Sequence, residues 1–462
     1  MHIKKYDVNY GRRALLEKVV QGIGTAGVLM PLWPLIANGA DMSKAYPDEL
    51  LSIELYTKGK LKPGDVVDAN NVDYVKDLLD PIGYHEVKNM GRTFHLVAPT
   101  TEAAKLNPHD YLEATLRNKG QAAFDANNNV VRKSDGGPWI GGLPFSDPQN
   151  GLEAIADITL SWGRHNFSSY AIRDWDIGPD GNVAYQYDFV WSEMNATARV
   201  DDTVFQNHKD ILRFQSVVFT APQDTAGTSF LSTWPYDQRQ FPELVGYLPA
   251  FRRLRQFPTN QRFEPLVPGI TLFLSDGWAS GDPMLTWGNY KIVERKPFLA
   301  SVSKNWHGKN PNWDTPTNGG PKGHTFFDTW KELVPEVIVL QKEPIGYPRS
   351  PYGKALAYID ARNGNFVGYN TYDRRGQVWK SHEPAFSQYV DGDVTFKDSK
   401  GHPEWSWCSA QSHDVQANRM SRFYHAKELP AGPKSIWGTP DTESQYYQQW
   451  LTAQAMTRLG SA

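Results

Sequence analysis

Apolar residues recur at helical spacing in three segments near the start of the chain, between residues 68 and 164. The segments lie at about 72–79, 109–117 and 150–162, and a strand-like piece over residues 93–97 separates the first two. This pattern predicts a group of N-terminal helices that each bury one face.

Polar and conformationally restricted residues mark where these helices begin and end. Asn70 or Asn71 can cap the first helix, and Asp147 or Asn150 can cap the third. Pro81 cannot donate a backbone hydrogen bond, so we expect the first helix to stop before it.

From residue 167 the apolar period changes from 3.6 to two, which predicts β-strands. In one of them Tyr185, Tyr187, Phe189 and Trp191 alternate with smaller or polar residues. Short turns between consecutive strands predict an antiparallel meander. The expected strands of this first block (about 167–300) are 170–177, 183–191, 211–221, 227–236, 246–255, and pieces near 270–274 and 290–293.

A second block of strands is expected over residues 335–382, with hairpin signals at Asn363-Gly364 and Arg375-Gly376. Its strands are 336–343, 355–360, 366–372 and 377–381. The irregular segment 301–328 between the blocks is either a lid or an excursion over the sheet. Residues 400–459 are expected to form a loop and a last helix that starts at Thr439-Pro440.

These elements predict a mainly β protein with some α structure (α+β). Its centre is a large curved antiparallel sheet, of which the two blocks can be halves, with helices packed in or across the concave side. Residues 40–462 are expected to form one large β domain.

The stretch Gly246–Arg255 is an unusual strand candidate, because rings and a proline precede three arginines. Alternation places Tyr247, Phe251, Arg253 and Arg255 on one face, and neither face is purely apolar. One interpretation is an edge strand blunted by Pro249 and by charge. The other is a surface that binds an amphiphile with an acidic head.

The composition limits the classes of partner and the kinds of site that we expect for this protein. A net charge of −3 argues against nucleic acid as a main partner. The single cysteine, Cys408, excludes an internal disulfide and a cysteine-based zinc site. The 13% aromatic content indicates either a core or a concave site lined with rings.

The N-terminus is typical of an export signal. Arg12-Arg13 precede a mildly apolar run over 19–37, and small residues follow at Ala37-Asn38-Gly39. We therefore predict that residues 1–39 are a signal peptide of the twin-arginine type and that the mature protein is periplasmic. The alternative is an N-terminal helix or a retained anchor.

No catalytic motif, cofactor fingerprint or metal-ligand spacing is found in the sequence, so we predict no catalytic residue, cofactor or metal. Asp391-Gly392-Asp393 with Asp398 resembles a calcium loop only superficially. Carboxylate pairs such as Asp174 and Asp176 are present, and the sequence does not tell whether two of them face each other across a cleft. An enzyme is disfavoured and not excluded.

The aromatic strands and the arginine stretch supply the candidate ligand-binding residues. The alternative for most of the rings is that they form core under the helices. The candidates are Tyr185, Tyr187, Phe189, Trp191, Phe230, Trp234, Tyr247, Phe251, Arg252, Arg253 and Arg255.

Several motifs carry a family resemblance. Tyr247-Leu248-Pro249-Ala250-Phe251-Arg252-Arg253-Leu254-Arg255 resembles a signature of outer-membrane lipoprotein-sorting-like proteins, which have a LolA/LolB-like half-barrel. The chain also resembles domain-of-unknown-function family thirteen-twenty-nine in three further stretches. They are Lys62–Asn71, Gly141–Phe145 and Asn150–Ala154.

The resemblance implies a periplasmic protein that binds a lipid or other hydrophobic molecule and is associated with an RND/MMPL-type exporter and an outer-membrane channel protein. It supplies no catalytic residue and no ligand. Our leading hypothesis is such a carrier or accessory protein, and the alternative is a secreted hydrolase or lyase acting on a lipid or carbohydrate. A third hypothesis is a scaffold whose rings are all core. An apolar cavity would favour the carrier, and two carboxylates facing each other in a polar pocket would favour the enzyme.

Overall fold

The computed structural model describes residues 46, 48–161, 164–258, 262–276, 282–438 and 443–461. The predicted signal peptide, 1–39, and the predicted helix start at Thr439-Pro440 lie outside the described residues. Within these ranges, no helix combines the length and the apolar character that a membrane span needs.

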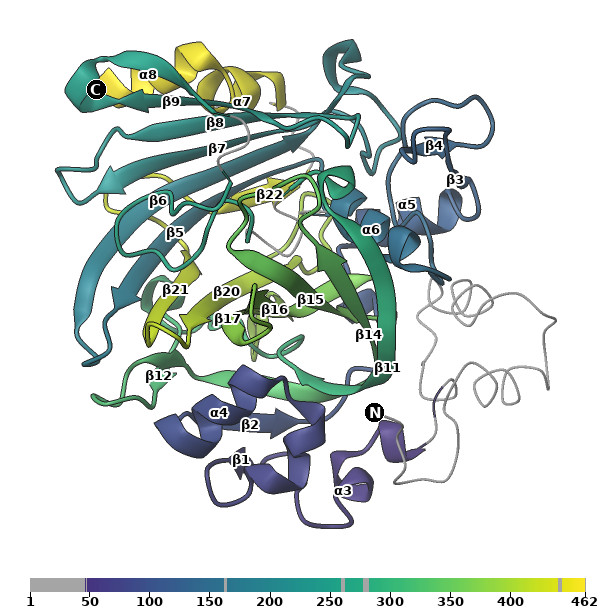
Figure 1. The fold of residues 1–462 in the computed structure, drawn as a ribbon, viewed down its shortest axis with the longest axis vertical. Coiled ribbons are helices and arrows are strands. Elements are labelled where there is room, and N and C mark those ends of the chain that lie inside the picture. Colours follow the sequence, from purple (N-terminus) through teal and green to yellow (C-terminus); the bar gives the residue numbers. More distant parts are fainter. Residues whose placement is uncertain are drawn as a thin grey trace.

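One large mixed sheet dominates the fold, with its strands on two sides of a common interior (Figure 1). All of its pairings are antiparallel except that of β2 with β14. In chain order its strands are β1 (Val66–Val67), β2 (Phe94–Val97), β5 (Phe167–Ile177), β6 (Val183–Asn195), β7 (Ile211–Ala221), β8 (Ser229–Pro235), β9 (Glu243–Leu248), β10 (Arg253–Phe257), β11 (Gly288–Ala300), β14 (Thr329–Glu343), β15 (Tyr352–Asp360), β16 (Asn365–Asp373), β17 (Val378–Gln388), β20 (Trp405–Asp414), β21 (Arg419–Ala426) and β22 (Ile436–Gly438).

Helices and small hairpins surround this sheet. The helices are α3 (Ile53–Tyr56), α4 (Pro81–Met90), α5 (His109–Arg117), α6 (Gly151–Leu160), α7 (Glu443–Trp450) and α8 (Ala453–Ser461). Short 3-10 turns are η2 (Asp48–Leu50), η3 (Val72–Leu78), η4 (Ala103–Lys105), η5 (Phe205–Asn207), η6 (Pro249–Phe251), η8 (Met284–Thr286) and η9 (Pro311–Trp313). The small strand pairs are β3 (Ala122–Phe124) with β4 (Val130–Arg132), β12 (Thr317–Asn318) with β13 (Phe326–Phe327), and β18 (Val390–Asp391) with β19 (Val394–Thr395).

The two predicted blocks of strands belong to one sheet, and β20 and β21 connect them. The order β17-β20-β21-β5 places Phe423 opposite both Ala410 and Asp174. The prediction of a loop over this part of residues 400–459 was wrong. Both strands are buried on both faces and carry polar side chains on each, so their sequences lack the alternation that indicates a strand.

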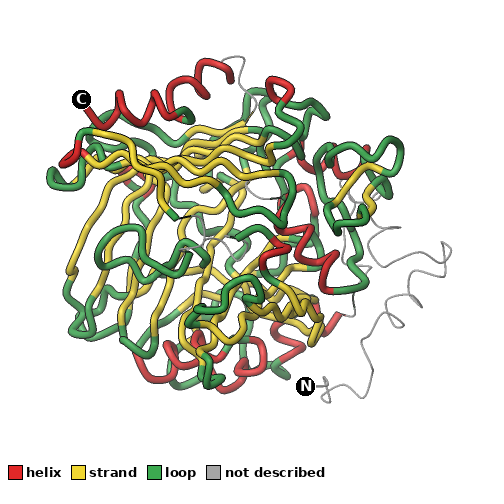
Figure 2. The backbone as a smooth tube through the Cα atoms, turned by 45° about the horizontal axis from the view of Figure 1, so that its top comes forward, coloured by secondary structure: helices red, strands yellow, loops and turns green. Residues whose placement is uncertain are grey.

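The faces of the sheet bury different sets of residues. Inner-facing Ile172, Phe189 and Phe219 belong to the largest core, to which α6 also contributes Ile155 and Ile158. On the outer face of β7 to β9, a separate cluster packs against α8, which lies along these strands (Figure 2). This cluster contains Val218, Leu231, Tyr247, Ala455 and Met456.

The local signals for helix starts were partly misinterpreted. Asn150 caps α6 as predicted, since its side chain accepts hydrogen bonds from the N–H groups of Leu152 and Glu153. Pro81, however, begins α4 and does not merely end the preceding turn η3. Proline is tolerated at a first helical position, and Asp80 caps this helix.

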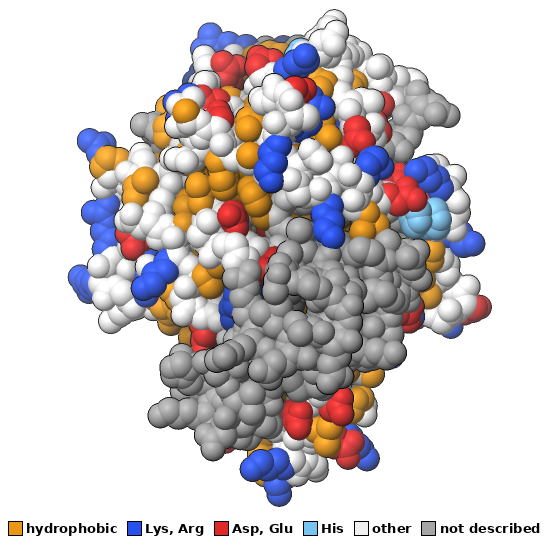
Figure 3. All heavy atoms as spheres, turned by 90° about the vertical axis from the view of Figure 1, so that its right-hand side faces the viewer, with side chains coloured by type: hydrophobic (Ala, Val, Ile, Leu, Met, Phe, Trp, Pro, Cys, Tyr) orange, Lys and Arg blue, Asp and Glu red, His pale blue; other side chains and the backbone are white. Residues whose placement is uncertain are grey.

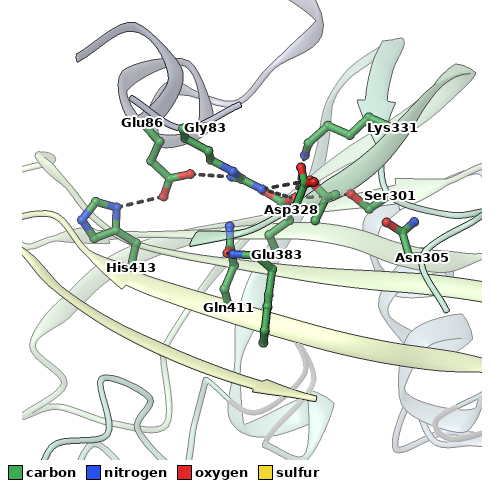
Figure 4. A network of polar contacts seen from close by, with 12 residues as sticks. Gly83, Glu86, Ser301, Asn305, Asp328, Lys331, Glu383, Gln411 and His413 are labelled. Atoms are coloured by element: carbon green, nitrogen blue, oxygen red, sulfur yellow. Dashed lines mark hydrogen bonds and ion pairs between the residues drawn. The ribbon is translucent and has the colours of Figure 1, made fainter. Parts of the chain in front are cut away.

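A buried polar network fastens α4 to the outer side of the sheet (Figure 4). Arg92 donates to both oxygens of Glu383 on β17 at 2.8 Å and to Glu86 of α4 at 2.5 Å. Lys331 donates to Glu383 at 2.7 Å, and His413 lies 2.8 Å from Glu86. Because each buried charge has an opposite partner, the network orients the N-terminal helices on the sheet.

The stretch Gly246–Arg255 is a hairpin and not the single strand that we predicted. Strand β9 ends at Leu248, the turn η6 reverses the chain, and Arg253 pairs with Leu248 in β10. Arg252 adopts a left-handed conformation (φ 50°) at this turn. Strand β10 is therefore an edge strand, as the first interpretation proposed, and the alternation across 246–255 does not hold.

Candidate functional site

An apolar cavity of about 120 Å³ lies against the inner face of β6 to β9. Its aromatic wall consists of Phe189 and Trp191 from β6, Phe219 from β7, and Phe230 and Trp234 from β8. These residues reach the same side because alternate positions of each strand face inward and neighbouring strands are in register. The sequence pattern of β6 and β8 thus builds a surface of rings.

Residues 262–276, which we call the plug segment, form the opposite wall. The segment was expected to contain a strand near 270–274, but it is irregular there and contributes Leu266, Ile270, Leu272, Phe273 and Leu274 to the cavity. Thr271 anchors it, because its backbone N–H donates to Ser421 Oγ (2.8 Å) and its carbonyl accepts from Lys380 Nζ (2.6 Å).

Four of the predicted ligand-binding residues line this cavity: Phe189, Trp191, Phe230 and Trp234. Tyr187 lies beside it in the same core, with its ring edge against Phe219 and its hydroxyl donating to the carbonyl of Pro268. The alternation of β6 and β8 was therefore a useful guide to the cavity wall.

The other aromatic candidates lie elsewhere. Tyr185 is 42% exposed and stacks on Tyr187. Tyr247 and Phe251, also predicted to bind ligand, do not line this cavity. Tyr247 faces outward under α8, and Phe251 is 50% exposed in the hairpin turn. The hairpin reverses the chain after Leu248, so the face assigned to these rings does not exist.

The arginines of the hairpin are also away from the cavity. Arg252, Arg253 and Arg255 are exposed, and Arg255 lies over the Phe251 ring with its guanidinium 4.0 Å from the ring centre. They form a small basic surface on the edge of the sheet.

A different arginine lines the cavity and was not predicted. Arg213 of β7 is buried over Trp234, with its guanidinium 4.7 Å from the ring centre. Burial lowers the pKa of Arg213 to about 10, so it remains charged at neutral pH. Gln215 beside it accepts a hydrogen bond from Trp234 Nε1 at 3.0 Å. This end of the cavity is therefore cationic and hydrogen-bonded.

Two carboxyl groups of β5 lie at the other end. Asp174 lines the cavity, and Asp176 follows it on the same inner face. Burial raises the pKa of Asp174 well above its usual range, and the neighbouring Asp176 raises it further. Burial also raises the pKa of Asp176 to about 7, against a hydrogen bond from Ser421 Oγ. The strand pattern Ile172, Asp174, Asp176 was the available signal that both face inward.

Histidine and lysine side chains from β17 complete this end. His382 lines the cavity, and burial lowers its pKa to about 4, so the ring is neutral at physiological pH. Lys380 Nζ lies 3.2 Å from the centre of the Phe273 ring and 3.4 Å from Asp276 Oδ2. Lys380 thus serves mainly to hold the plug segment.

A second cavity of about 40 Å³ lies on the other side of Trp191, between β5, β6, α6 and β20. The indole of Trp191 lines both spaces and donates from Nε1 to Glu193 Oε1 at 2.6 Å. Trp191 is therefore part of the wall of both cavities.

The surface of the protein carries apolar groups as well. Figure 3 shows a patch of hydrophobic side chains on one face, with Lys and Arg side chains around it. A group that could offer metal ligands, His109, Asp110 and Glu113 of α5, is also at the surface. Its ligand atoms lie within 4.8 Å of one another, but Lys400 Nζ already contacts Asp110 at 2.7 Å.

The fold and the cavity define a mainly β protein in which a large sheet and a plug segment enclose an apolar space. Residues 66–455 match the family described as "Protein of unknown function (DUF1329)", and the chain belongs to this family. The resemblance drawn from the sequence motifs is confirmed.

The chain also resembles an uncharacterized protein, PA3922, of Pseudomonas aeruginosa. The two are 24% identical over 349 residues, which cover 72% of this chain and 71% of that protein.

Three solved structures are similar to this chain. A DUF1329 family protein from Desulfovibrio piger is 12% identical, with a TM-score of 0.41, and the overlap covers 65% of this chain and 98% of that one. A putative outer membrane lipoprotein-sorting protein domain from Vibrio parahaemolyticus is 14% identical, with a TM-score of 0.37 and coverage of 63% and 92%. A LolA superfamily protein from Nitrosomonas europaea is 12% identical, with a TM-score of 0.34 and coverage of 62% and 96%.

Proposed function

We propose that the protein is a periplasmic carrier or accessory protein that holds a lipid or other hydrophobic molecule on the inner face of its sheet. The supporting observation is the cavity between the rings of β6 to β8 and the plug segment. Apolar cavities with a few convergent polar groups are the usual form of small-molecule sites.

The size of the cavity limits what it can hold without rearrangement. A space of about 120 Å³ is close to that of an engineered cavity that binds benzene. Burying about 150 Å² of apolar surface yields about 4 kcal/mol, whereas association costs about 4–15 kcal/mol. A carrier must therefore bury more than about 150 Å² of its ligand for the gain to exceed the cost of association.

We therefore propose that the plug segment moves aside when a longer molecule binds. It is irregular, and a small number of hydrogen bonds connect it to the sheet. Thr271 is bonded to Ser421, Ser412 and Lys380, Tyr187 donates to the carbonyl of Pro268, and Tyr352 donates to Asp276. A ligand that buried about 400 Å² would gain roughly 10 kcal/mol. The sheet would then act as an open half-barrel of the LolA/LolB type, with α6 and the plug segment across its concave side.

Export and transport partners complete the proposal. We propose that residues 1–39 direct the chain to the periplasm by the twin-arginine route. There it would work beside an RND/MMPL-type exporter and an outer-membrane channel protein. Arg252, Arg253 and Arg255 are exposed on the edge hairpin, where they could meet an acidic surface of such a partner.

Native purification followed by extraction and lipid mass spectrometry tests the proposal, together with titration of a fluorescent fatty-acid probe. A bound apolar species or probe uptake is expected. The variant Ser232→Phe fills the cavity from β8 and should abolish uptake, whereas Thr233→Phe, on the opposite face of the same strand, should not. If neither a bound species nor uptake is found, the proposal is wrong.

The alternative of a hydrolase or lyase is not favoured by the cavity. That hypothesis expects two carboxylates facing each other across a polar pocket. Asp174 and Asp176 instead lie side by side on one strand, at the end of an apolar space.

A further inference from the structure

The Asp174 carboxyl is a buried polar group that lines the cavity without a hydrogen-bond partner for either oxygen among the described residues. The residue is 1% exposed and lines the apolar space. Within the described residues, neither of its oxygens makes a hydrogen bond of ordinary geometry, although the Trp175 N–H nearby lowers its pKa slightly. Burying a carboxyl without a partner costs free energy, so such a group in a binding cavity points to a partner supplied by the ligand.

The surroundings of Asp174 favour a positively charged partner. Asp176 lies on the same face of β5, and its Oδ2 also has no hydrogen-bond partner among the described residues. The backbone of the plug segment closes over it at Gly269, where a Cβ would lie 2.8 Å from that oxygen. Two adjacent carboxyls repel a ligand carboxylate and attract a cation.

The protein's own cations do not occupy this position. Arg422 of β21 lies on the outer face, over the rings of Trp175 and Phe327, and acts on Asp174 only through space, as Arg419 acts on Asp176. Lys380 is bonded to the plug segment, and His382 is neutral. Tyr187 of β6 and Ser421 of β21 are the other titratable or polar neighbours.

The cationic end of the cavity is distant. Asp174 pairs with Tyr187 of β6, and Arg213 pairs with Asn195 of the same strand. Those two positions are eight residues apart, which corresponds to about 26 Å along the strand. Arg262 belongs to the same end as Arg213, since it also lies over Trp234 and is paired with Asp282.

We propose that Asp174, with Asp176 beside it, is a recognition site for a protonated amine, so that the ligand is an apolar molecule ending in a basic nitrogen. This inference rests on the proposed function of the cavity. An ammonium group donates the hydrogen bonds that these oxygens lack and neutralises the charge that ionisation would bury. An alcohol offers only a neutral hydrogen bond, and a carboxylate is repelled.

Binding of an amine should depend on pH in a defined direction. In the empty cavity both carboxyls hold their protons tightly, because burial raises the pKa of each. A bound ammonium group instead favours the ionised form of the carboxyls. Affinity for the amine is therefore expected to rise between pH 5 and pH 8, with release of protons on binding. Affinity for a neutral alcohol of the same length should change little.

Calorimetric titration of the full chain with octylamine, 1-octanol and octanoate tests the proposal, because the three probes share one apolar chain. Octylamine should bind at least about tenfold more tightly than 1-octanol at pH 8. Asp174→Asn should abolish this preference and leave 1-octanol binding in place. Asp188→Asn, which changes a carboxyl on the neighbouring strand outside the cavity, should keep it.

The possible outcomes distinguish a failure of the amine site from a failure of the proposed carrier function. If the wild-type protein binds 1-octanol as tightly as octylamine, or Asp174→Asn retains the amine preference, the amine site is wrong while the carrier stands. If none of the three probes binds, the proposed function fails and the amine site fails with it. The comparison of probes on the wild-type protein is decisive even if a variant folds poorly.

Discussion

Single buried charges carry much of the specificity of this fold, and Glu383 is the clearest case. Burial opposes its ionisation, but Arg92 and Lys331 outweigh burial and hold the pKa of Glu383 far below its usual range. The carboxylate joins β17 to the segment that contains α4. Its charge is therefore part of the native structure at neutral pH.

Replacing Glu383 by Gln should destabilise the protein by about 3–5 kcal/mol at pH 7, because Arg92 and Lys331 would lose their shared counter-charge. A depressed pKa contributes stability above the unfolded value, about 4.3, and loses it as the pH falls. The difference between wild type and variant should therefore shrink in acid, as urea unfolding at pH 7 and pH 3 would measure.

The control for Glu383→Gln is Asp73→Asn, which breaks the exposed pair with Lys88 at the same edge of the molecule. It should leave stability unchanged within error. Equal effects of the two substitutions would contradict the assigned role of Glu383.

Asp176 predicts a pH dependence of opposite sign. Its pKa in the folded protein, about 7, lies above the value of an unfolded aspartate, so ionisation favours unfolding. Between about pH 4 and pH 7, stability should fall as the pH rises. Asp176→Asn should remove this loss and stabilise the protein by at least about 1 kcal/mol at pH 8, and by less at pH 5. A constant difference between the two pH values would contradict the assignment.

At the scale of elements, contact between the C-terminal helix and the sheet depends on a glycine. A Cβ at Gly460 of α8 would lie 2.1 Å from Tyr247 Cδ1 and 2.8 Å from the carbonyl oxygen of Gly227. The helix can therefore approach β9 only because residue 460 has no side chain.

The variant Gly460→Ala should cost about 1–3 kcal/mol and should raise hydrogen exchange in residues 453–461. Thr457→Ala, on the exposed side of the same helix, should change neither quantity. If Gly460→Ala is as stable as wild type, α8 is not held in the way described.

Regular elements were predictable from the sequence where one face is apolar and the other polar. Strand β6 and helix α5 have this form, and the apolar face of β6 carries two of the four cavity rings that were predicted. Strands β20 and β21 were missed, since polar residues such as Gln411 and His413 are buried in contacts with distant segments. A hydrogen-bond partner that is distant in the sequence cannot be recognised from the residues of the strand itself.

The cavity, like the fold, was predictable only where a strand shows regular alternation. Alternation identified the rings, but Arg213 and the plug segment joined the cavity only through the three-dimensional arrangement. The arginine hairpin was misplaced because Pro249 marks a turn and not an interruption of one strand. A conspicuous sequence motif therefore gave the family and not the binding site.

At the scale of the whole molecule, the two cavities share one wall. Trp191→Ala should join them, since its indole lines both. We expect the preferred chain length in a series of alkyl probes to increase, with tighter binding of longer chains, as titration calorimetry would measure. Tyr185→Ala, which alters an exposed ring of the same strand, should leave the preference unchanged. An unchanged preference in Trp191→Ala would mean that the second space is not accessible to ligand.

The position of β20 and β21 has a consequence for synthesis on the ribosome. Residue 173 of β5 pairs with residue 424 of β21, so the first half of the sheet acquires its neighbour only when the chain is nearly complete. Until then the nascent protein exposes unpaired edges at β5 and β17, which are prone to aggregate. Export before folding is complete would expose the same edges, so a route that transports folded chains would suit this topology. Because β20 and β21 join the two halves of the sheet, the sheet can be completed only after these late strands have been synthesised.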